Sequence, residues 1–233
     1  MSEKMFKKKK EKMQVIIIMA IICFGCAVMA IMDGIIRPGY ALKSAVKILV
    51  FFLVPMIYSN CTKSIDWKKI FQWNKTGMKV TFMLAISVYL FILGAYFVVQ
   101  NFFDFSKITN LLANNAGVTG DKFVFVALYI SFINSLLEEF FFRGFAFFSL
   151  KKLTTRKFAY IVSSFAFSLY HVAMMQGWFS VVLFLLTMTG LAVGGILFNF
   201  LNEKSETIYN SWLVHMFANF AINTVGFILF GMI

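Results

Sequence analysis

The stretch LLEEFFFRG, at residues 136–144, places two glutamates and one arginine inside an apolar run that extends from residue 122 to residue 149. A helix needs roughly 20 residues to cross the hydrocarbon core of a bilayer, and this run is longer. A charged side chain at mid-membrane costs about 3 kcal/mol on insertion scales, so charged groups there are candidates for function. We therefore interpret the run as a membrane-spanning helix that carries reactive side chains.

The composition of the whole chain agrees with a membrane protein. Of its 233 residues, 61% are hydrophobic and only 14% are charged, and the mean hydropathy is +0.82. A soluble fold of this size needs more charge to cover its surface. Disordered chains are poor in apolar residues, so disorder is excluded as well. What is left is a polytopic integral membrane protein, with lipid covering most of its apolar surface.

Seven apolar stretches divide the chain, and the sequence therefore predicts an all-α bundle of about seven transmembrane helices. The number becomes eight with a short or re-entrant helix, and the loop at 101–122 is predicted to hold a short interfacial helix. Three glycines in the sixth stretch, Gly190, Gly194 and Gly195, indicate close packing against another helix. The seven stretches are 14–32, 42–59, 79–100, 122–149, 158–175, 178–200 and 208–232.

Basic residues are concentrated at one end of the predicted bundle. The net charge is +12, and six lysines fall within the first twelve residues. The loops near 60–79 and 150–157 are also basic, so the positive-inside rule predicts a cytoplasmic amino terminus and a carboxyl terminus on the outer side. The lysine tail is expected to attract anionic lipid headgroups. No nucleic-acid partner is expected, because nothing aromatic and polar is interleaved with the lysines.

Ionisable and amide side chains recur within three of the predicted spans. The fourth span contains the acid pair and its arginine, the fifth contains one histidine, and the seventh contains a histidine and an asparagine. Each would be costly alone in a membrane, so we expect them to meet around one hydrated cavity. Asn134 and Ser211, also within spans, are expected only to form hydrogen bonds between helices. The six candidates are Glu138, Glu139, Arg143, His171, His215 and Asn219.

Helical spacing predicts how these side chains face. Glu139 and Arg143 are four residues apart and can pair on one face, whereas Glu138 is rotated by about 100° from Glu139. His215 and the asparagine four residues after it also share a face. Counted along the spans, Glu138 approaches the basic end of its helix while His171 lies deeper, so their depths agree only approximately. A re-entrant start to the fifth span would align them.

This set of side chains suits hydrolysis by an activated water molecule. A carboxylate in a low-dielectric cavity can act as a general base, and an imidazole can share its proton or orient the water. A second histidine and an asparagine can donate hydrogen bonds to a developing oxyanion. These are the parts of a hydrolase that attacks a carbonyl, and a peptide bond within the membrane is the expected target. One glutamate and two histidines could instead hold a zinc ion. We rank this alternative second, because the sequence has no HExxH motif, which would place two zinc-binding histidines on one helix.

Three motifs, in this order along the chain, resemble those of the CAAX-protease and bacteriocin-processing family (CPBP, or Abi) of intramembrane endopeptidases. Residues 138–143 are similar to its EExxxR motif, residues 167–171 to FxxxH, and residues 215–219 to HxxxN. Each motif alone is a weak signal, but the three together on separate apolar spans are specific. The resemblance covers roughly residues 122–223.

The resemblance implies roles for the matching residues. Glu138 and His171 would activate the water, while His215 and Asn219 would form the oxyanion site. The ion pair described above would support them, and its glutamate, Glu139, is also counted among the catalytic residues. No cofactor is required in this reading. If zinc is bound, its ligands would be Glu138, His171 and His215.

The resemblance also implies a domain organisation and a biological setting. Bacterial relatives are linked to bacteriocin maturation, self-immunity and the processing of signalling peptides. A bacterial cell membrane and a membrane-associated peptide or protein substrate are therefore expected. The domains are a basic cytoplasmic tail at 1–13, amino-terminal transmembrane helices at 14–121 and a catalytic transmembrane core at 122–233.

Two other functions stay open at this point. A non-catalytic immunity or scaffold protein would bind a partner through the same cavity, and its function would survive Glu138→Gln. A small proton-coupled transporter would use the buried carboxylates and show a flux that depends on pH. The sequence has no inverted repeat, which speaks against a transporter.

Overall fold

The computed structural model describes residues 2–75, 77–105, 107–111 and 118–233, and every regular element within these ranges is helical. Six of the described helices are long and apolar enough to cross a membrane. The chain is therefore an all-α integral membrane protein. The first two spans consist of α1 (Ser2–Ile31) with the π-helical turn η1 (Met32–Ile36), and of α2 (Tyr40–Ile48), η2 (Leu49–Leu53) and α3 (Val54–Thr62).

The remaining spans follow a short helix, α4 (Trp67–Ile70). The third span is α5 (Met78–Val99), and the fourth is one long helix that alternates between α- and π-helical turns. Its segments are α7 (Gly120–Tyr129), η3 (Ile130–Asn134), α8 (Ser135–Glu138), η4 (Glu139–Phe147) and α9 (Phe148–Leu153). The last three helices are α10 (Arg156–Tyr170), α11 (Val181–Ser205) and α12 (Tyr209–Leu229).

The predicted count of seven transmembrane helices is not confirmed, because the fifth predicted span is a short helix. α10 has 15 residues and ends at Tyr170, whereas the sequence predicted a span at 158–175. At 1.5 Å per residue it rises about 22 Å, which is less than the roughly 30 Å of a bilayer core. The chain continues from its end as turns through residues 171–178.

The extra short helix expected in the loop at 101–122 falls mostly outside the described residues. Residues 107–111 are helical, and residues 112–117 are among those that the structure does not describe. A short helix is present elsewhere, because α4 lies in the loop between the second and third spans. Its backbone contacts the connection between α11 and α12, where the Ile208 amide donates to the Ile70 carbonyl at 3.2 Å.

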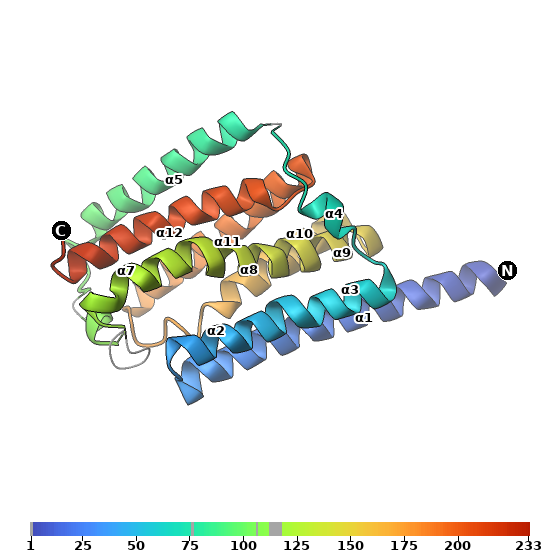
Figure 1. Ribbon diagram of the computed structural model, residues 1–233, viewed down its shortest axis with the longest axis horizontal. Coiled ribbons are helices and arrows are strands. Elements are labelled where there is room, and N and C mark those ends of the chain that lie inside the picture. Colours follow the sequence, from blue (N-terminus) through green and yellow to red (C-terminus); the bar gives the residue numbers. More distant parts are fainter. Residues whose placement is uncertain (1, 76, 106, 112–117) are drawn as a thin grey trace.

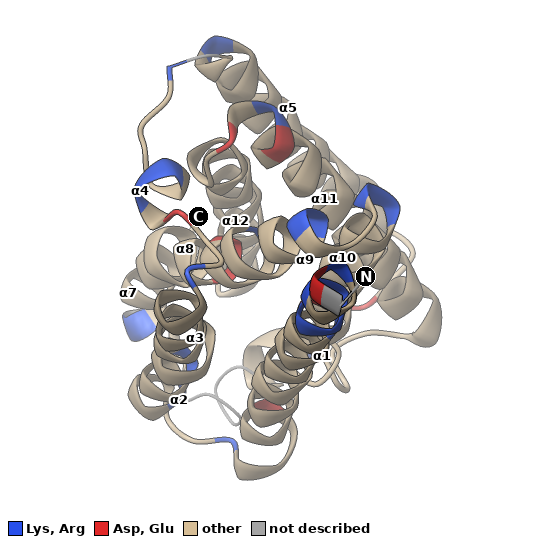
Figure 2. Cartoon of the chain, turned by 90° about the vertical axis from the view of Figure 1, so that its right-hand side faces the viewer, with Lys and Arg blue, Asp and Glu red and all other residues tan. Residues whose placement is uncertain are grey.

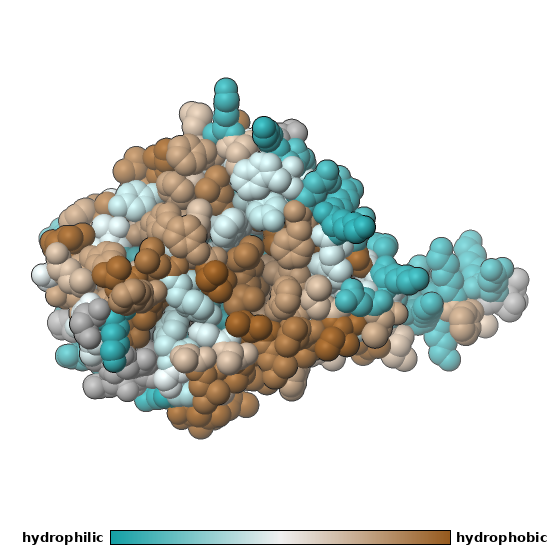
Figure 3. Space-filling model, in the orientation of Figure 1, coloured by the Kyte–Doolittle hydropathy of each residue, from teal (hydrophilic) through white to brown (hydrophobic). Residues whose placement is uncertain are grey.

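The two chain termini lie at opposite ends of the bundle (Figure 1). The loop that contains α4 and the turn between α9 and α10 lie at the amino-terminal end, and Figure 2 shows lysines and arginines gathered there. In the space-filling view the hydrophilic residues are concentrated at this end, on the projecting start of α1, while brown apolar residues cover much of the flank (Figure 3). The basic loops therefore share one side, as the charge pattern predicted.

Local sequence signals define where the helices near the site begin. The Thr155 side chain accepts a hydrogen bond from the Phe158 amide at 3.2 Å and caps α10. Ser180 caps α11 in the same way, with a distance of 3.4 Å to the Leu183 amide. Such caps satisfy amides that have no partner within the helix. Because the turn at 154–155 is so short, α10 returns directly along the helix that precedes it.

The predicted close packing of the sixth span is confirmed for one of its three glycines. A Cβ atom built on Gly195 would lie 2.9 Å from the Ser164 Cα atom in α10, closer than real Cβ contacts come. Gly190 and Gly194 have nothing within 4 Å of such an atom. Of these three glycines, only Gly195 lies at a close approach of α11 to α10, the helix that ends next to His171.

Gly195→Ala is expected to lower the free energy of unfolding by about 1–3 kcal/mol, because the added methyl group meets backbone rather than a flexible side chain. Gly194→Ala is the matched control, and its higher helix propensity should raise stability by up to about 1 kcal/mol. The measurement is thermal unfolding of both purified variants in detergent. Equal unfolding temperatures for the two alanine variants would contradict the tight α10–α11 contact.

Candidate active site

The two predicted glutamates lie in the middle of the long fourth helix, not near its basic end. Glu138 is 18 residues after Gly120 and 15 residues before Leu153, the first and last residues of that helix. The helix becomes π-helical at Glu139 and stays so to Phe147, and each of these nine residues is buried. Short π-helical insertions within α-helices often occur at functional sites. Glu138 therefore lies about one helical turn further from the basic end than the predicted span placed it.

The depth mismatch between the helices resolves without a re-entrant segment. Glu138 and His171 each lie 16 residues from the turn formed by Thr154 and Thr155, so the antiparallel helices place them at the same level. The α11–α12 connection also reaches into the bundle, because Ile208 is fully buried there. α12 consequently starts deep enough to bring His215, six residues after Tyr209, to the same level.

Glu138 is the centre of the site, and its two carboxylate oxygens have different surroundings. Its side chain is 2% exposed. Oε1 accepts hydrogen bonds from the Lys47 ammonium at 2.6 Å and from the Asn134 amide at 2.9 Å. Oε2 has no hydrogen-bond partner among the described residues and lies 3.8 Å from His171 Nε2 and 3.7 Å from His215 Nε2. Oε2 is therefore the oxygen available for chemistry.

Both histidines present the same nitrogen to Glu138. His171 Nδ1 lies 2.8 Å from the Phe167 carbonyl oxygen, and His215 Nδ1 lies 2.8 Å from Glu139 Oε1. Since a carbonyl and a carboxylate only accept hydrogen bonds, each Nδ1 carries a proton. In the neutral ring, Nε2 then offers a lone pair. Three polar atoms, one oxygen and two nitrogens, thus converge within a buried part of the bundle, from two helices and the residue that follows α10.

The predicted ion pair between Glu139 and Arg143 is present and fully buried. Arg143 Nη1 lies 3.0 Å from Glu139 Oε1, and both side chains are 0% exposed. Glu139 Oε2 accepts a short hydrogen bond from the Ser211 hydroxyl. The guanidinium carbon lies 4.1 Å from the centre of the Phe167 ring, so the cation packs on an aromatic face. Glu139 therefore joins the arginine to the imidazole of His215 and fixes the orientation of that ring.

Asn219 lies on the same face of α12 as His215, one turn further along, as predicted. Its side-chain nitrogen donates to the Ile130 carbonyl at 3.2 Å, within the π-helical turn η3, and the residue is 8% exposed. This bond uses one of the two amide hydrogens. The second hydrogen is the one that can serve a substrate oxyanion, and that role stays a prediction.

A zinc ion held by Glu138, His171 and His215 would require these side chains to lie closer together than they do here. Two ligand atoms on a tetrahedral zinc are about 3.3 Å apart, given bonds of about 2.0–2.1 Å. The corresponding distances here are 3.7 and 3.8 Å, and the other oxygen of the same carboxylate is bound by the Lys47 ammonium. Within the described ranges no group of three or more histidine, cysteine, aspartate or glutamate side chains has a metal-binding arrangement.

Sequence reasoning missed Lys47, Tyr170, Asn134 and Ser211 as members of the site. Lys47 is an ionisable residue inside the second apolar stretch, so the rule that identified the glutamates could have found it. Asn134 and Ser211 form hydrogen bonds between helices, as expected, but these bonds belong to the site, because Ser211 donates to Glu139 and Asn134 bonds both Lys47 and Glu138. Nothing in the sequence distinguishes these two from the other amides and hydroxyls of the spans.

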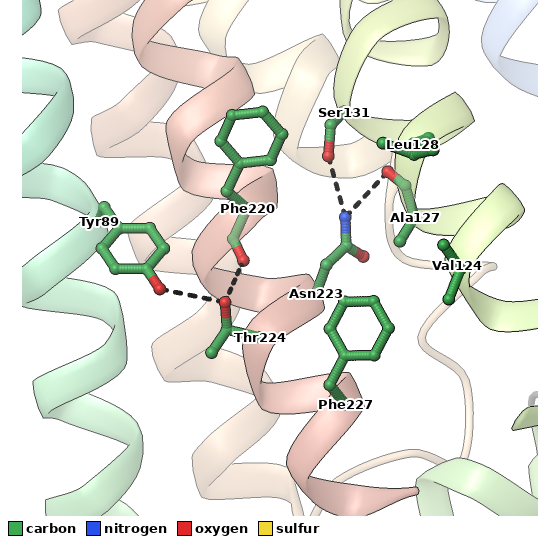
Figure 4. Close-up of a pocket in the computed structure, with 9 residues that line it drawn as sticks. All are labelled: Tyr89, Val124, Ala127, Leu128, Ser131, Phe220, Asn223, Thr224 and Phe227. Carbon is green, nitrogen blue, oxygen red and sulfur yellow. Dashed lines mark hydrogen bonds between the residues drawn. The ribbon is translucent and has the colours of Figure 1, made fainter. Parts of the chain in front are cut away.

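A separate pocket of about 290 Å³ lies between α5, α7 and α12 (Figure 4). Asn223 lines this pocket, and its side-chain nitrogen donates hydrogen bonds to the Ala127 carbonyl at 3.1 Å and to the Ser131 hydroxyl at 3.0 Å. The hydroxyl groups of Tyr89 and Thr224, which also line the pocket, are hydrogen-bonded to each other at 3.1 Å. Asn223 is two turns, about 12 Å, along α12 from His215. None of the six predicted site residues lines this pocket.

With the three motifs assembled in one buried site, comparison with protein families gives a match. Residues 120–221 match the family described as Rce1-like, type II CAAX prenyl endopeptidase. This region resembles the Rce1-like family. The match contains all six predicted site residues and confirms the resemblance to the CAAX-protease family. No match was found among curated proteins or among solved structures.

The family that this region resembles is named for endopeptidase activity of the CAAX type. The region begins at the first residue of α7 and ends inside α12, so it takes in the long fourth helix, α10, α11 and most of α12. Lys47 in α2 lies outside it, although its ammonium bonds Glu138. The site described above thus lies in the region that resembles the Rce1-like family, and Lys47 joins it from a preceding helix.

Proposed function

We propose that this protein is an intramembrane endopeptidase that hydrolyses a peptide bond of a membrane-associated peptide or protein with a water activated by glutamate and histidine. The observation that carries the proposal is the convergence of Glu138 Oε2 with the Nε2 atoms of His171 and His215, at 3.8 and 3.7 Å. A water molecule bound at this point would donate one hydrogen to the carboxylate. The family match supports the reaction class.

In the proposed reaction, Glu138 Oε2 takes a proton from the water, and the resulting hydroxide attacks the carbonyl carbon of the scissile bond. His171, whose tautomer is fixed by the Phe167 carbonyl, accepts a hydrogen bond from the water and orients it. The tetrahedral intermediate then breaks its C–N bond, and Glu138 returns the proton to the leaving amine. Water is thereby divided between the two products, and the carboxylate is regenerated.

His215 and Asn219 would stabilise the oxyanion of the intermediate. Because Glu139 lies on Nδ1, the His215 ring can carry protons on both nitrogens, and its Nε2–H group can then donate to the oxyanion. Asn219 retains a second amide hydrogen beside its bond to Ile130. Glu139 therefore acts through His215, and Arg143 balances its charge.

The biological setting is part of the proposal. A buried site among helices suits a substrate that enters from the membrane, and we place the protein in a bacterial cell membrane with its amino terminus in the cytoplasm. Peptide maturation, bacteriocin processing or self-immunity are the roles that this activity would serve. The exposed lysines at the start of α1 extend beyond the bundle and would bind anionic lipid headgroups (Figure 3).

The test is cleavage of defined peptides by the purified chain in liposomes. The probes are one quenched fluorescent peptide with a farnesylated carboxy-terminal CAAX sequence, the same peptide without the farnesyl group, and a peptide with a single transmembrane segment. Mass spectrometry identifies the products. Cleavage of the farnesylated probe alone would indicate the substrate class named by the family, whereas cleavage of the third would indicate a peptide recognised by its apolar segment.

His171→Ala is expected to lower kcat by about 10²–10⁴-fold, because the water loses a group that orients it and shares its proton. Asn223→Ala is the control, since Asn223 bonds between helices two turns away from His215. Its kcat should stay within about threefold of the parent. Cleavage rates that are equal in the two variants would contradict the role of His171.

A further inference from the structure

Lys47 is the one charged side chain that the amino-terminal helices contribute to the described site. It lies in α2, and its side chain is 2% exposed. The ammonium nitrogen lies 2.5 Å from Asn134 Oδ1, 2.6 Å from Glu138 Oε1 and 2.7 Å from the Tyr170 hydroxyl oxygen. A lysine ammonium has three hydrogens, so these three acceptors use all of them.

The three acceptors come from two different helices of the Rce1-like region. Asn134 and Glu138 are one turn apart on the long fourth helix, and Tyr170 is the last residue of α10. Tyr170 directly precedes His171. The ammonium also lies 4.8 Å from the centre of the Tyr170 ring. A single side chain thus ties the residue beside one catalytic histidine to the catalytic carboxylate.

These bonds determine which carboxylate oxygen faces the histidines. Lys47 and Asn134 both donate to Oε1 of Glu138 and leave Oε2 without a donor among the described residues. A carboxylate free to rotate would expose either oxygen at various angles. We propose that Lys47 is a positioning residue that fixes Glu138 through Oε1, so that Oε2 points at the water site between His171 and His215. This inference rests on the proposed function.

The chain offers a matched control one helical turn away. Lys43 also lies in α2, four residues before Lys47, and its ammonium pairs with Asp33 from the π-helical turn η1. Its side chain is 18% exposed. Replacing Lys43 therefore removes a partly buried ion pair from the same helix face without touching Glu138. A general loss of stability in α2 would affect both variants, whereas a loss of positioning would affect only Lys47 variants.

The experiment compares Lys47→Met, Lys47→Gln and Lys43→Met in the full chain, reconstituted in liposomes with whichever quenched fluorescent peptide the parent cleaves. Each variant is used only if its circular dichroism and elution volume match those of the parent. Because misplacing a reacting group by about 1 Å can cost 10²-fold, we expect kcat to fall about 10- to 100-fold in both Lys47 variants. KM should stay within about threefold, since Lys47 does not touch the substrate, and Lys43→Met should keep the parent's kcat.

Each result decides the inference. Lys47 variants as active as Lys43→Met, or variants that change only KM, would overturn it while leaving the proposed function in place. A parent chain that leaves every peptide intact, or cleavage that survives Glu138→Gln, would contradict the proposed function and this inference together. If neither Lys47 variant folds, Tyr170→Phe replaces them. This substitution removes only the hydroxyl oxygen, which is one of the three acceptors of the Lys47 ammonium. An unchanged kcat in Tyr170→Phe would then count against the positioning role.

Discussion

Glu138→Gln is expected to lower kcat by about 10²–10⁴-fold, the usual contribution of a general base. The glutamine amide has the shape of the carboxylate, and its oxygen can still accept hydrogen bonds from Lys47 and Asn134. The substitution therefore keeps these two bonds. What the amide cannot do is take a proton from water near neutral pH. The measurement is steady-state cleavage of the peptide that the parent hydrolyses, with product masses determined at the end of the reaction.

Glu203→Gln is the matched control for this substitution. Glu203 is a glutamate in α11 that pairs with Arg156 at 2.7 Å and with Lys151 at 2.8 Å, at the basic end of the bundle. The Glu203→Gln variant should keep the parent's activity. Glu138→Gln with undiminished cleavage would remove the general base from the mechanism. A Glu138→Gln variant without cleavage that still protects a host strain would instead favour an immunity or scaffold role.

Arg143→Met is expected to lower the free energy of unfolding by about 3–5 kcal/mol, because it leaves the Glu139 carboxylate buried without its cation. Arg143 and Glu139 are both 0% exposed, so neither water nor salt can replace the lost partner. The double variant Glu139→Gln/Arg143→Met should recover much of this loss, since it also removes the stranded charge. Chemical or thermal unfolding in detergent, with both variants and the parent, measures the effect.

Arg156→Met is the corresponding control at the surface. Arg156 pairs with Glu203, but its side chain is 64% exposed, and exposed ion pairs contribute only about 0–1 kcal/mol. A large loss of stability in this variant, or a small one in Arg143→Met, would show that burial does not set the strength of these pairs. If the double variant were less stable than Arg143→Met, Glu139 would be held mainly by Ser211 and His215 rather than by the arginine.

Local features of the sequence predicted much of the site. The pairing of Glu139 with Arg143 follows from a spacing of four residues on one helix, and the structure confirms it at 3.0 Å. The separate orientation of Glu138 follows from the turn of about 100° between neighbours on a helix. Membrane insertion makes each of these groups costly alone, which is why the sequence predicts that they meet in one buried site.

Other features depend on where the helices end and on how they pack. The fifth predicted span is a short helix because the chain leaves helical geometry at Tyr170, and its hydropathy gives no sign of that end. The partner of Asn219 is the Ile130 carbonyl, which a π-helical turn exposes to α12. Backbone carbonyls have no identity in the sequence, so such a partner cannot be inferred from residue types.

By itself the sequence determined that this chain is a membrane-spanning helical protein and that its second half carries three motifs that resemble those of an endopeptidase family. Only the tertiary structure decided that Lys47 binds Glu138, across 91 positions of the chain, and so which oxygen of that carboxylate faces the histidines. The physical reason is that periodicity along one helix fixes which side chains share a face. Contacts between helices depend instead on crossing positions, loop lengths and close approaches such as that of Gly195 to Ser164.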